Sequence, residues 1–361
     1  MKRKKAALYD PYLDTMGGGE RHVLAIMQVL EQLGYTISIY WNTDLSQEIE
    51  KKLDLHFKTK INFETNIFRE HTSHNDKMAA LKDVDIFIYV TDGSYFFSSA
   101  KHNFIFCMVP DKQLYQMSIL NRIKLRNYQY IANSSFTASR LKDWGIQPEI
   151  IYPYINDDFI SMNVNRIKKE QIILSVGRFF PHLHAKRQDV VIETYKKLVK
   201  QNPDYKKYKL VLAGGVKDED KQYFSELKSR AEGYDSILFY PNISYKELLD
   251  LYKKASIYWH FTGYGLNDHA HPEKVEHLGI TPLEAMASGC VTFCYNAGGP
   301  KEIIQEGKTG YLFDNDEDLI YKMKLFNPDQ MKVMQKNGKE YVTSHFSYEV
   351  FKQQVMNIMK P

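Results

Sequence analysis

The sequence predicts an α/β protein with two halves, each built around a parallel β-sheet. Short runs of β-branched and aromatic residues alternate with longer helical patterns along the whole chain. The length of 361 residues exceeds the usual size of one hydrophobic core, and a polar, charged stretch at 156–170 separates two series of such runs. We therefore expect two Rossmann-like domains whose sheets face each other across a cleft, with a hinge near that stretch.

The first half is predicted from alternating strand and helix patterns. It begins with a strand at 4–10, a helix at 20–34 and a second strand at 35–41. Apolar side chains fall on one face of this helix, and Gly34 ends it. Further strands are expected at 84–90, 102–109, 129–134 and 149–153.

The second half repeats this alternation. Strands are expected at 171–178, 208–215, 236–242, 256–263, 290–296 and 310–313. Helices are expected at 187–201, 220–231, 244–255 and, beyond the last strand, 347–360. These patterns give a first domain over residues 1–160, a second over 161–340 and a terminal segment over 341–361.

Composition excludes several classes of protein. Hydrophobic residues make up 43% of the chain and charged residues 25%, which is typical of globular proteins and argues against disorder. No run approaches the roughly 18 apolar residues of a membrane span, and the basic start lacks the apolar core of a signal peptide. Three cysteines cannot all pair and show no zinc-site spacing, so we expect buried thiols and a cytoplasmic protein.

The net charge of +4 is only a weak indication of partners. Arg and Lys gather with tyrosines at 121–130, which fits an anionic membrane surface, although such a stretch is more often a solvated face. It carries no recognised nucleic-acid motif, so no nucleic-acid partner is expected. A peripheral location on the inner face of a membrane stays open.

A glycine-rich loop follows the first predicted strand. In parallel sheets, ligands bind beyond the carboxyl ends of the strands. Gly17, Gly18 and Gly19 precede a helix there, so backbone N–H groups could approach an anion, and a tight turn without a ligand is the alternative. The loop lacks the third-glycine spacing of a dinucleotide fingerprint and the lysine of a Walker loop.

Three further side chains follow strands of the second half. Arg178 follows the first of these strands, and Lys186 lies close to the next helix. The planar guanidinium of Arg178 could bind a diphosphate through two hydrogen bonds, and the ammonium of Lys186 could bind it as a point charge. Each cation alone would more often be a solvated surface charge. His260 ends a very apolar strand, where a histidine is more often a core group than an acid or base.

Two glutamates, Glu276 and Glu284, stand with seven residues between them. Thr281 and Glu284 have the form of a capping box with Pro282 at the first helical position, so Glu284 could be only a helix cap. Beside the two cations, however, these carboxylates could accept hydrogen bonds from sugar hydroxyls, and the helix start would favour negative charge. Together these residues indicate a site for a nucleotide diphosphate sugar.

The chain resembles retaining, nucleotide-sugar-dependent glycosyltransferases of the GT-B fold, in the large group 1 or family four type with an E-x(7)-E segment. The resemblance covers residues 171–313, where "SVGRF", "KRQD", "LAGG", "FYPNIS", "HPEKVEHLGITPLEAMASGC" and "AGGPKEII" fit in order. It extends more loosely to "GGGERH" and "IANSSFTASRL" in the first half. It implies an acceptor domain followed by a donor domain, with the last helix crossing back to the first.

The resemblance also implies roles for the E-x(7)-E segment. Glu284 would hold the ribose hydroxyls, and Glu276 would hold the hydroxyls of the transferred sugar. The backbone of Gly279, Ile280 and Thr281 would bind the sugar and phosphates.

The remaining roles that the resemblance implies concern the diphosphate. Arg178 and Lys186 would bind it and stabilise it as the leaving group, so that these two and Glu276 form the catalytic set. Gly18 and Gly19 would close on it from the other domain. The insert between the two cations is longer than is common in the family, which makes Arg187 an alternative to Lys186. His260 stays a further candidate.

The implied activity is retaining transfer of a hexose, without a metal or other cofactor, in surface polysaccharide or glycolipid synthesis. The donor would be a UDP- or GDP-sugar and the acceptor a glycan or a lipid-linked glycan. Many members carry a histidine near the acceptor, whereas residues 104–115 here have none. The alternatives are a protein that binds a nucleotide sugar or glycan without transfer, and a glycoside hydrolase that uses the two glutamates.

Overall fold

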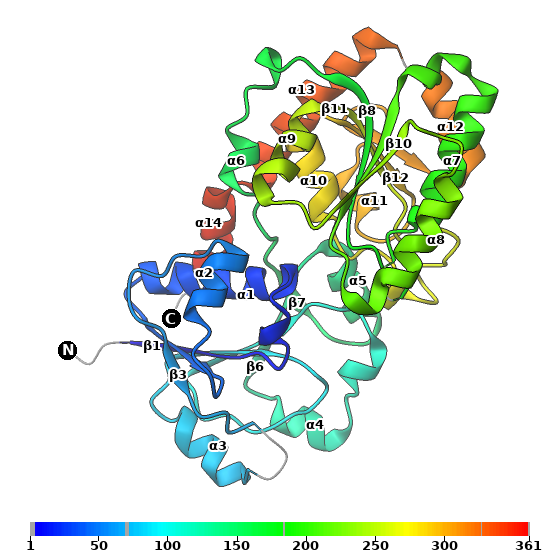
Figure 1. Cartoon of the computed structure of the whole chain (residues 1–361). Coiled ribbons are helices and arrows are strands. Elements are labelled where there is room, and N and C mark those ends of the chain that lie inside the picture. The colour runs from blue at the N-terminus through cyan, green and yellow to red at the C-terminus, as the bar shows by residue number, and fades with distance from the viewer. Residues whose placement is uncertain (1–3, 69–71, 183–184, 326, 360–361) are drawn as a thin grey trace. The chain divides into compact units, whose positions relative to one another are not determined.

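The computed structural model of the chain describes residues 4–68, 72–182, 185–325 and 327–359 (Figure 1). Its contacts divide the chain into two compact units, Met1–Tyr154 with Glu349–Pro361, and Ile155–Tyr348. Each unit contains one parallel β-sheet. The predicted α/β class with two Rossmann-like sheets is therefore confirmed.

The first unit is built on a seven-stranded sheet with the order β3-β2-β1-β4-β5-β6-β7. Its strands are β1 (Lys5–Tyr9), β2 (Thr36–Tyr40), β3 (Asn62–Glu64), β4 (Ile86–Val90), β5 (His102–Cys107), β6 (Tyr128–Ala132) and β7 (Pro148–Ile150). All pair in parallel. The central strands β1, β4 and β5 are almost wholly buried, as expected for a sheet that helices cover on both faces.

The helices of the first unit include the last helix of the chain. They are α1 (Gly18–Gln32), α2 (Ser46–Leu53), α3 (His74–Leu81), α4 (Ile119–Lys124), α5 (Ser135–Asp143) and α14 (Tyr348–Ile358), with short 3-10 turns at Leu13–Thr15 and Lys112–Tyr115. The Phe351 ring on α14 lies 5.9 Å from the His22 ring on α1. The Gln354 side chain accepts a hydrogen bond from the backbone N–H of Tyr152. The last helix thus packs on α1 after the chain has completed the second unit (Figure 1).

The second unit is built on a six-stranded parallel sheet with the order β10-β9-β8-β11-β12-β13. Its strands are β8 (Glu170–Val176), β9 (Lys209–Gly214), β10 (Ile237–Pro241), β11 (Ala255–His260), β12 (Val291–Tyr295) and β13 (Gly310–Phe313). The strand order reverses between β8 and β11, so the chain leaves these two neighbours in opposite directions. Such a reversal opens a crevice at the carboxyl ends of the two strands.

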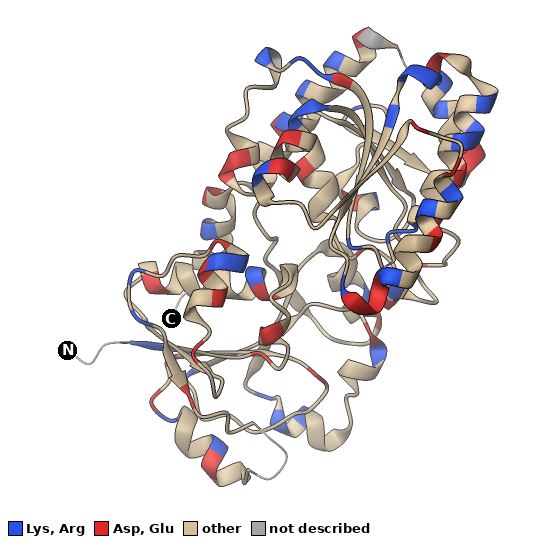
Figure 2. Ribbon diagram, in the orientation of Figure 1, with Lys and Arg blue, Asp and Glu red and all other residues tan. Residues whose placement is uncertain are grey.

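Helices connect the strands of the second unit. They are α6 (Asp157–Ile160), α7 (Gln188–Gln201), α8 (Lys221–Ala231), α9 (Tyr245–Lys254), α10 (Ile280–Ala287), α11 (Pro300–Ile303), α12 (Asp316–Leu325) and α13 (Pro328–Phe346). Shorter 3-10 turns lie at Val164–Arg166, Pro203–Lys207, Asp218–Asp220 and Pro272–Lys274. Lysines, arginines and acidic residues are interspersed along these helices (Figure 2). In the described part of the chain, no helix combines the length and apolar character needed to cross a bilayer.

The core of the second unit holds the central strands in place. Trp259, Phe293 and Phe313 are fully buried together with apolar residues of α7 and α12. The three cysteines are free and buried, as the sequence predicts. Because Trp259 lies next to His260 at the end of β11, this packing fixes the point from which the following loop departs.

Candidate functional site

Lys186 and Glu276 meet at the point where the strand order of the second unit reverses. Lys186 lies in the loop after β8 and Glu276 in the loop after β11. The Lys186 Nζ lies 2.5 Å from the Glu276 Oε2, and the two side chains are only 17% and 18% exposed. A Cβ atom on Gly177 would lie 2.4 Å from the Lys186 Cγ, so only glycine at the end of β8 leaves room for the lysine stem. The structure thus brings two predicted site residues, 90 positions apart, into one ion pair.

Burial and charge act against each other on Glu276. Burial opposes its ionisation, but the Lys186 ammonium and the contact with His260 outweigh burial and hold the pKa of the carboxyl well below its usual value. Glu276 is therefore a carboxylate at neutral pH, an acceptor of hydrogen bonds and not a proton donor.

His260 belongs to the same cluster. Its side chain is 2% exposed, and its Nε2 lies 2.9 Å from the Glu276 Oε2. Burial lowers the pKa of the imidazole despite the neighbouring carboxylate, so His260 is neutral at neutral pH. Its ring stacks on Tyr258, at 6.4 Å between centroids. His260 is thus a core histidine, as its position predicts, but it also borders Glu276.

Two glycines that sequence reasoning gave no role fix the backbone of Glu276. The Gly299 N–H donates to the Glu276 carbonyl at 2.7 Å. A Cβ atom on Gly298 would lie 2.2 Å from that carbonyl oxygen, and one on Gly299 would lie 2.3 Å from the Leu278 Cα. The two glycines can be read from the sequence "AGGP", but only their close contacts with the backbone of Glu276 and Leu278 show why side chains are not tolerated there.

Helix α10 begins two residues earlier than the capping-box interpretation of the sequence requires. Gly279, in a left-handed conformation with φ 108°, precedes Ile280 as the N-cap, and no side chain caps this helix start. Thr281 and Pro282 are therefore the second and third helical residues, and the predicted capping box is wrong. The N–H groups of the first turn have no intrahelical acceptor, which favours an anion near Gly279, Ile280 and Thr281.

Glu284 lies in the second turn of α10, partly exposed. Its Oε2 accepts a hydrogen bond from the Tyr252 hydroxyl at 2.9 Å, and Tyr252 is fully buried. This contact orients one carboxylate oxygen from the buried side of the helix. Tertiary packing rather than helix capping therefore holds Glu284.

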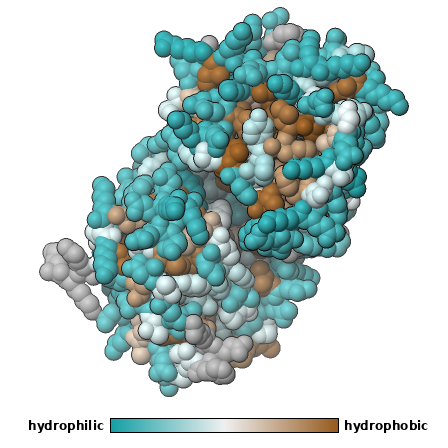
Figure 3. Space-filling view, in the orientation of Figure 1, coloured by the Kyte–Doolittle hydropathy of each residue, from teal (hydrophilic) through white to brown (hydrophobic). Residues whose placement is uncertain are grey.

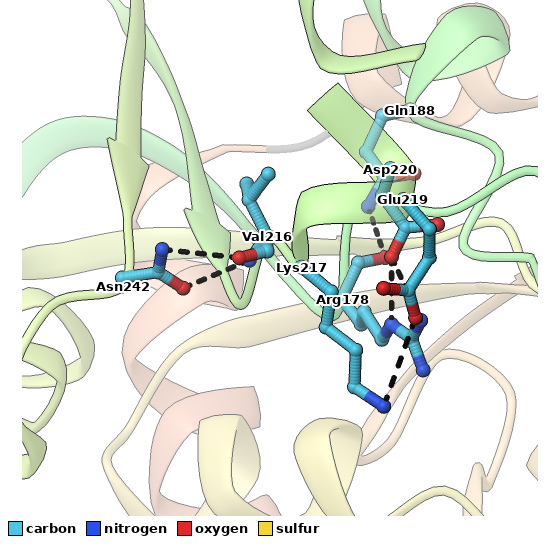
Figure 4. A network of polar contacts seen from close by, with 7 residues as sticks. All are labelled: Arg178, Gln188, Val216, Lys217, Glu219, Asp220 and Asn242. Atoms are coloured by element: carbon cyan, nitrogen blue, oxygen red, sulfur yellow. Dashed lines mark hydrogen bonds and ion pairs between the residues drawn. The ribbon is translucent and has the colours of Figure 1, made fainter. Parts of the chain in front are cut away.

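Arg178 lies in a polar network at the ends of β8 and β9 (Figure 4). Its Nη2 lies 2.7 Å from the Oδ2 of Asp220, which is almost fully buried, and 3.3 Å from the Glu219 Oε1. The Gln188 amide donates to the Arg178 carbonyl at 3.1 Å and fixes the backbone. The structure does not join Arg178 to the Lys186 and Glu276 pair. Its guanidinium is held by two carboxylates that the sequence analysis did not single out.

Arg187, the alternative to Lys186, points elsewhere. Its guanidinium pairs with the Asp189 carboxylate at 3.1 Å and donates to the Tyr264 carbonyl at 2.9 Å. Its backbone is left-handed with φ 51°, which is uncommon for a residue with a side chain. It lines an open pocket of about 360 Å³ together with His182, Tyr264 and Lys274. Of the two neighbouring cations, Lys186 is therefore the one that contacts Glu276.

The glycine-rich loop belongs to the first unit. Gly17 precedes α1, and the Glu20 Oε2 accepts the Gly17 N–H at 2.6 Å. A Cβ atom on Gly19 would lie 2.2 Å from the Met108 Sδ, whereas one on Gly18 would meet no atom within 4 Å. Gly19 is thus needed for packing against Met108, which directly follows β5, and Gly18 leaves the backbone open to approach. A capping carboxylate was not expected at this helix start.

Asp10, at the end of β1, is a buried carboxyl group that sequence reasoning missed. Its Oδ1 accepts the Tyr12 N–H at 2.9 Å, and its Oδ2 has no hydrogen-bond partner among the residues that the structure describes. Burial, with a smaller contribution from Glu20, raises the pKa of Asp10 to about 7. The only signal in the sequence was its position directly after a strand.

Replacement of Asp10 by Asn is expected to reduce the pH dependence of stability. The raised pKa means that folded Asp10 keeps a proton which the unfolded chain has lost. The stability from this proton is full below about pH 4 and disappears as the pH rises through 7, by on the order of 4 kcal/mol. Urea denaturation at several pH values should show that the free energy of unfolding of Asp10→Asn lacks this decrease with rising pH. Asp235→Asn, at an exposed position of the second unit, serves as the control, and equal pH slopes for wild type and Asp10→Asn would contradict the prediction.

Relatives with assigned activities are similar to much of this chain. The chain is 29% identical over 274 residues to the Xenopus tropicalis GDP-Man:Man(3)GlcNAc(2)-PP-Dol alpha-1,2-mannosyltransferase, covering 67% of this chain and 53% of the relative. It is 26% identical over 270 residues to the Dictyostelium discoideum alpha-1,3/1,6-mannosyltransferase ALG2, covering 64% of this chain and 60% of the relative. The chain thus spans about half to three fifths of the length of these relatives.

Solved structures share the fold of the whole chain. A glycosyltransferase from Rickettsia africae ESF-5 superposes with a TM-score of 0.75 at 17% identity over 100% of both chains. Anabaena HepE, in complex with UDP, superposes with a TM-score of 0.71 at 13% identity over 99% of both chains. At these identities the likeness establishes the GT-B fold.

More than half of the chain matches one protein family. Residues 157–341 match the family described as "Glycosyl transferases group 1". This range includes strands β8 and β11, Lys186 and the E-x(7)-E segment. The resemblance found in the sequence is therefore confirmed, and the chain belongs to the glycosyl transferases group 1 family.

Proposed function

We propose that this protein transfers a hexose from a nucleotide diphosphate sugar to a glycan or lipid-linked acceptor, with retention of the anomeric configuration and without a metal. The observation that carries the proposal is the ion pair of Lys186 and Glu276 at the strand-order reversal. It places a cation suited to a phosphate beside an ionised carboxylate suited to sugar hydroxyls. Both groups lie in loops that follow the two strands at the reversal, which is where open parallel sheets bind ligands.

In this proposal, the residues around the pair divide the donor between them. Lys186 and the first turn of α10 neutralise the diphosphate and stabilise the charge that develops on it as it leaves. Glu276 accepts hydrogen bonds from the transferred sugar, and Glu284 accepts them from the ribose. Arg178 binds the diphosphate only if its guanidinium contacts the ligand and Asp220 at the same time. The roles of Gly18 and Gly19 stay predictions.

The relatives favour a particular donor. Two groups of similar proteins are named as mannosyltransferases, and one of these names specifies GDP-mannose and a dolichyl diphosphate-linked acceptor. We therefore propose GDP-mannose as the first donor to test and UDP-sugars as the second. A lipid-linked acceptor would place the protein at the inner face of a membrane, as a peripheral protein.

The rival functions differ in what they require of Glu276. A glycoside hydrolase that used Glu276 as its general acid would need this carboxyl protonated, but Lys186 keeps Glu276 ionised. A protein that only binds nucleotide sugars would use the same pair without turnover. A measurement of turnover therefore distinguishes the binding protein from the transferase.

The proposed activity is tested by incubation with GDP- and UDP-sugars, with and without a lipid-linked glycan. We expect release of nucleotide diphosphate only when both donor and acceptor are present, with unchanged rates in excess EDTA. NMR of the product should show the anomeric configuration of the donor. Binding without release for every donor and acceptor pair would favour the non-catalytic alternative, and a strong loss of rate in EDTA would contradict the metal-free mechanism.

A further inference from the structure

Asp268 is a buried acidic residue to which the proposed function gives no role. It lies in the loop that follows β11 and carries Glu276. The surface in view is mostly hydrophilic (Figure 3), and charged side chains usually lie on such a surface. The side chain of Asp268, in contrast, is only 10% exposed. A buried carboxyl group needs polar partners, and the partners of Asp268 indicate what it does.

Two groups share one oxygen of Asp268. Its Oδ2 accepts the Gly298 N–H at 2.9 Å and lies 2.7 Å from the Lys301 Nζ. Burial opposes ionisation of Asp268, but this N–H and the Lys301 ammonium outweigh burial and lower the pKa of the carboxyl. Asp268 is therefore a carboxylate at neutral pH, and it makes charge-assisted contacts with the segment in which α11 begins.

The turn that Asp268 holds is the turn that fixes the backbone of Glu276. Gly298 is left-handed with φ 66°, and the Gly299 N–H donates to the Glu276 carbonyl at 2.7 Å. A Cβ atom on Gly298 would lie 2.2 Å from this carbonyl oxygen and 2.8 Å from the Val275 Cγ2. The turn and the Glu276 backbone therefore pack without spare room, so a shift of the turn moves Glu276 or breaks the contact.

The beginning of the loop packs against its end. A Cβ atom on Gly263 would lie 2.9 Å from the Cγ1 of Val275, which is fully buried. The Asn267 side chain accepts two backbone N–H groups and forms the turn that contains Asp268. The loop therefore has little freedom between Asp268 and Glu276.

The contacts of Asp268 are better suited to hold a site than to stabilise the fold. The Lys301 side chain is 43% exposed, and an ion pair with a lysine this close to solvent contributes little to stability. A side chain that binds a substrate, however, must be held within about 0.5 Å of its working position. A charged anchor for the turn behind Glu276 meets this requirement.

We propose that Asp268, supported by Lys301, is a positioning residue for Glu276. It holds the turn at 298–299, and the turn holds the Glu276 backbone so that the carboxylate meets Lys186. In this proposal Asp268 acts only through Glu276 and does not bind the donor. The inference rests on the proposed function for the sugar that Glu276 would contact, but not for the dependence of Glu276 on Asp268.

The test compares Asp268→Ala, Glu276→Gln and the double variant. Asp268→Ala should lower kcat roughly 10- to 100-fold, because displacement of a substrate-binding group by about 1 Å has an effect of this size. Its affinity for the bare nucleotide diphosphate, measured by calorimetry, should not be weaker than that of wild type, since this ligand lacks the sugar. In the Glu276→Gln background, Asp268→Ala should have almost no further effect on kcat, because the effects of residues that act through one group do not add.

Two smaller changes and a control accompany these variants. Asp268→Asn keeps an oxygen for the Gly298 N–H, so its kcat should lie between those of wild type and Asp268→Ala. Lys301→Met removes the other partner of the carboxylate and should have an intermediate effect too. Asp250→Ala removes an exposed carboxylate of α9 that lies 3.7 Å from its lysine partner, and its kcat should equal that of wild type. If Asp268→Ala does not fold, Asp268→Asn replaces it in the comparison.

A wild-type kcat in Asp268→Ala would overturn the proposal, as would effects of the two single variants that multiply in the double variant. If wild type turns over no donor, the proposed function fails, and urea denaturation then tests the dependence of Glu276 on Asp268 by itself. The shifts of the unfolding midpoint should not add in the double variant, because a displaced Glu276 no longer meets Lys186. Additive shifts would overturn the proposal.

Discussion

Replacement of Lys186 by Met is expected to lower kcat by on the order of 10²- to 10³-fold, the usual effect of losing one group that stabilises charge in a transition state. Lys186 is the cation that contacts Glu276 at the strand-order reversal, and its stem fits only because residue 177 is glycine. The leaving diphosphate gains negative charge as the glycosidic bond breaks. Met keeps the apolar stem but cannot compensate that charge, so the loss should appear mainly in turnover.

Steady-state kinetics with the best donor and acceptor pair measures this effect. Lys253→Met serves as the control, because Lys253 is a 41% exposed lysine of α9 that pairs only weakly, at 3.7 Å, with Asp250. Circular dichroism and the midpoint of thermal unfolding should show that both variants are folded. A Lys186→Met enzyme with wild-type turnover would remove Lys186 from the catalytic set and return attention to Arg178.

The two glutamates are expected to fail in different ways when each is changed to Gln. Glu284→Gln should bind the bare nucleotide diphosphate roughly 10- to 150-fold more weakly, because a charged hydrogen bond to a ribose hydroxyl is lost. Glu276→Gln should lower turnover by a similar factor through the transferred sugar. It should bind the bare nucleotide as before or more tightly, since it releases Lys186 from its carboxylate partner.

Calorimetry with the nucleotide diphosphate, combined with kinetics, separates the two effects. Tyr252→Phe is the companion variant for Glu284, because it removes the buried hydroxyl that donates to the Glu284 carboxylate at 2.9 Å and also lies 3.4 Å from the Thr281 carbonyl. It should weaken nucleotide binding less than Glu284→Gln does. Equal nucleotide affinity in wild type and Glu284→Gln would show that Glu284 does not hold the ribose, and equal turnover in Glu276→Gln would do the same for the sugar.

The sequence predicted the sheets well because their signal is local. The strands of both units are short apolar runs, because a parallel strand that is buried on both faces needs apolar side chains at almost every position. The elements that were missed have weak local signals. Strand β3 has only three residues, and α13 contains Gly338, which packs closely against Met286 of α10 and interrupts the helical pattern.

The sequence names candidate site residues, which stay predictions, but it does not give their contacts. The spacing of Glu276 and Glu284 is readable, whereas the partner of each one comes from a distant part of the chain. The Asp220 partner of Arg178 lies 42 positions away, and no local pattern marks it. The capping box failed because Thr281 and Glu284 satisfy a local rule that the left-handed Gly279 overrides. Local rules cannot weigh such tertiary contacts.

The ion pair of Lys186 and Glu276 also affects which small anions the protein tolerates. The ammonium and the carboxylate lie 2.5 Å apart and satisfy each other. Inorganic phosphate or sulfate would have to separate them and would leave the Glu276 carboxylate half-buried without its cation, which is costly. A nucleotide sugar offers phosphate oxygens to one partner and hydroxyl donors to the other at the same time. In the proposed function, the pair would therefore favour a ligand that offers both phosphate oxygens and hydroxyl donors over a simple anion.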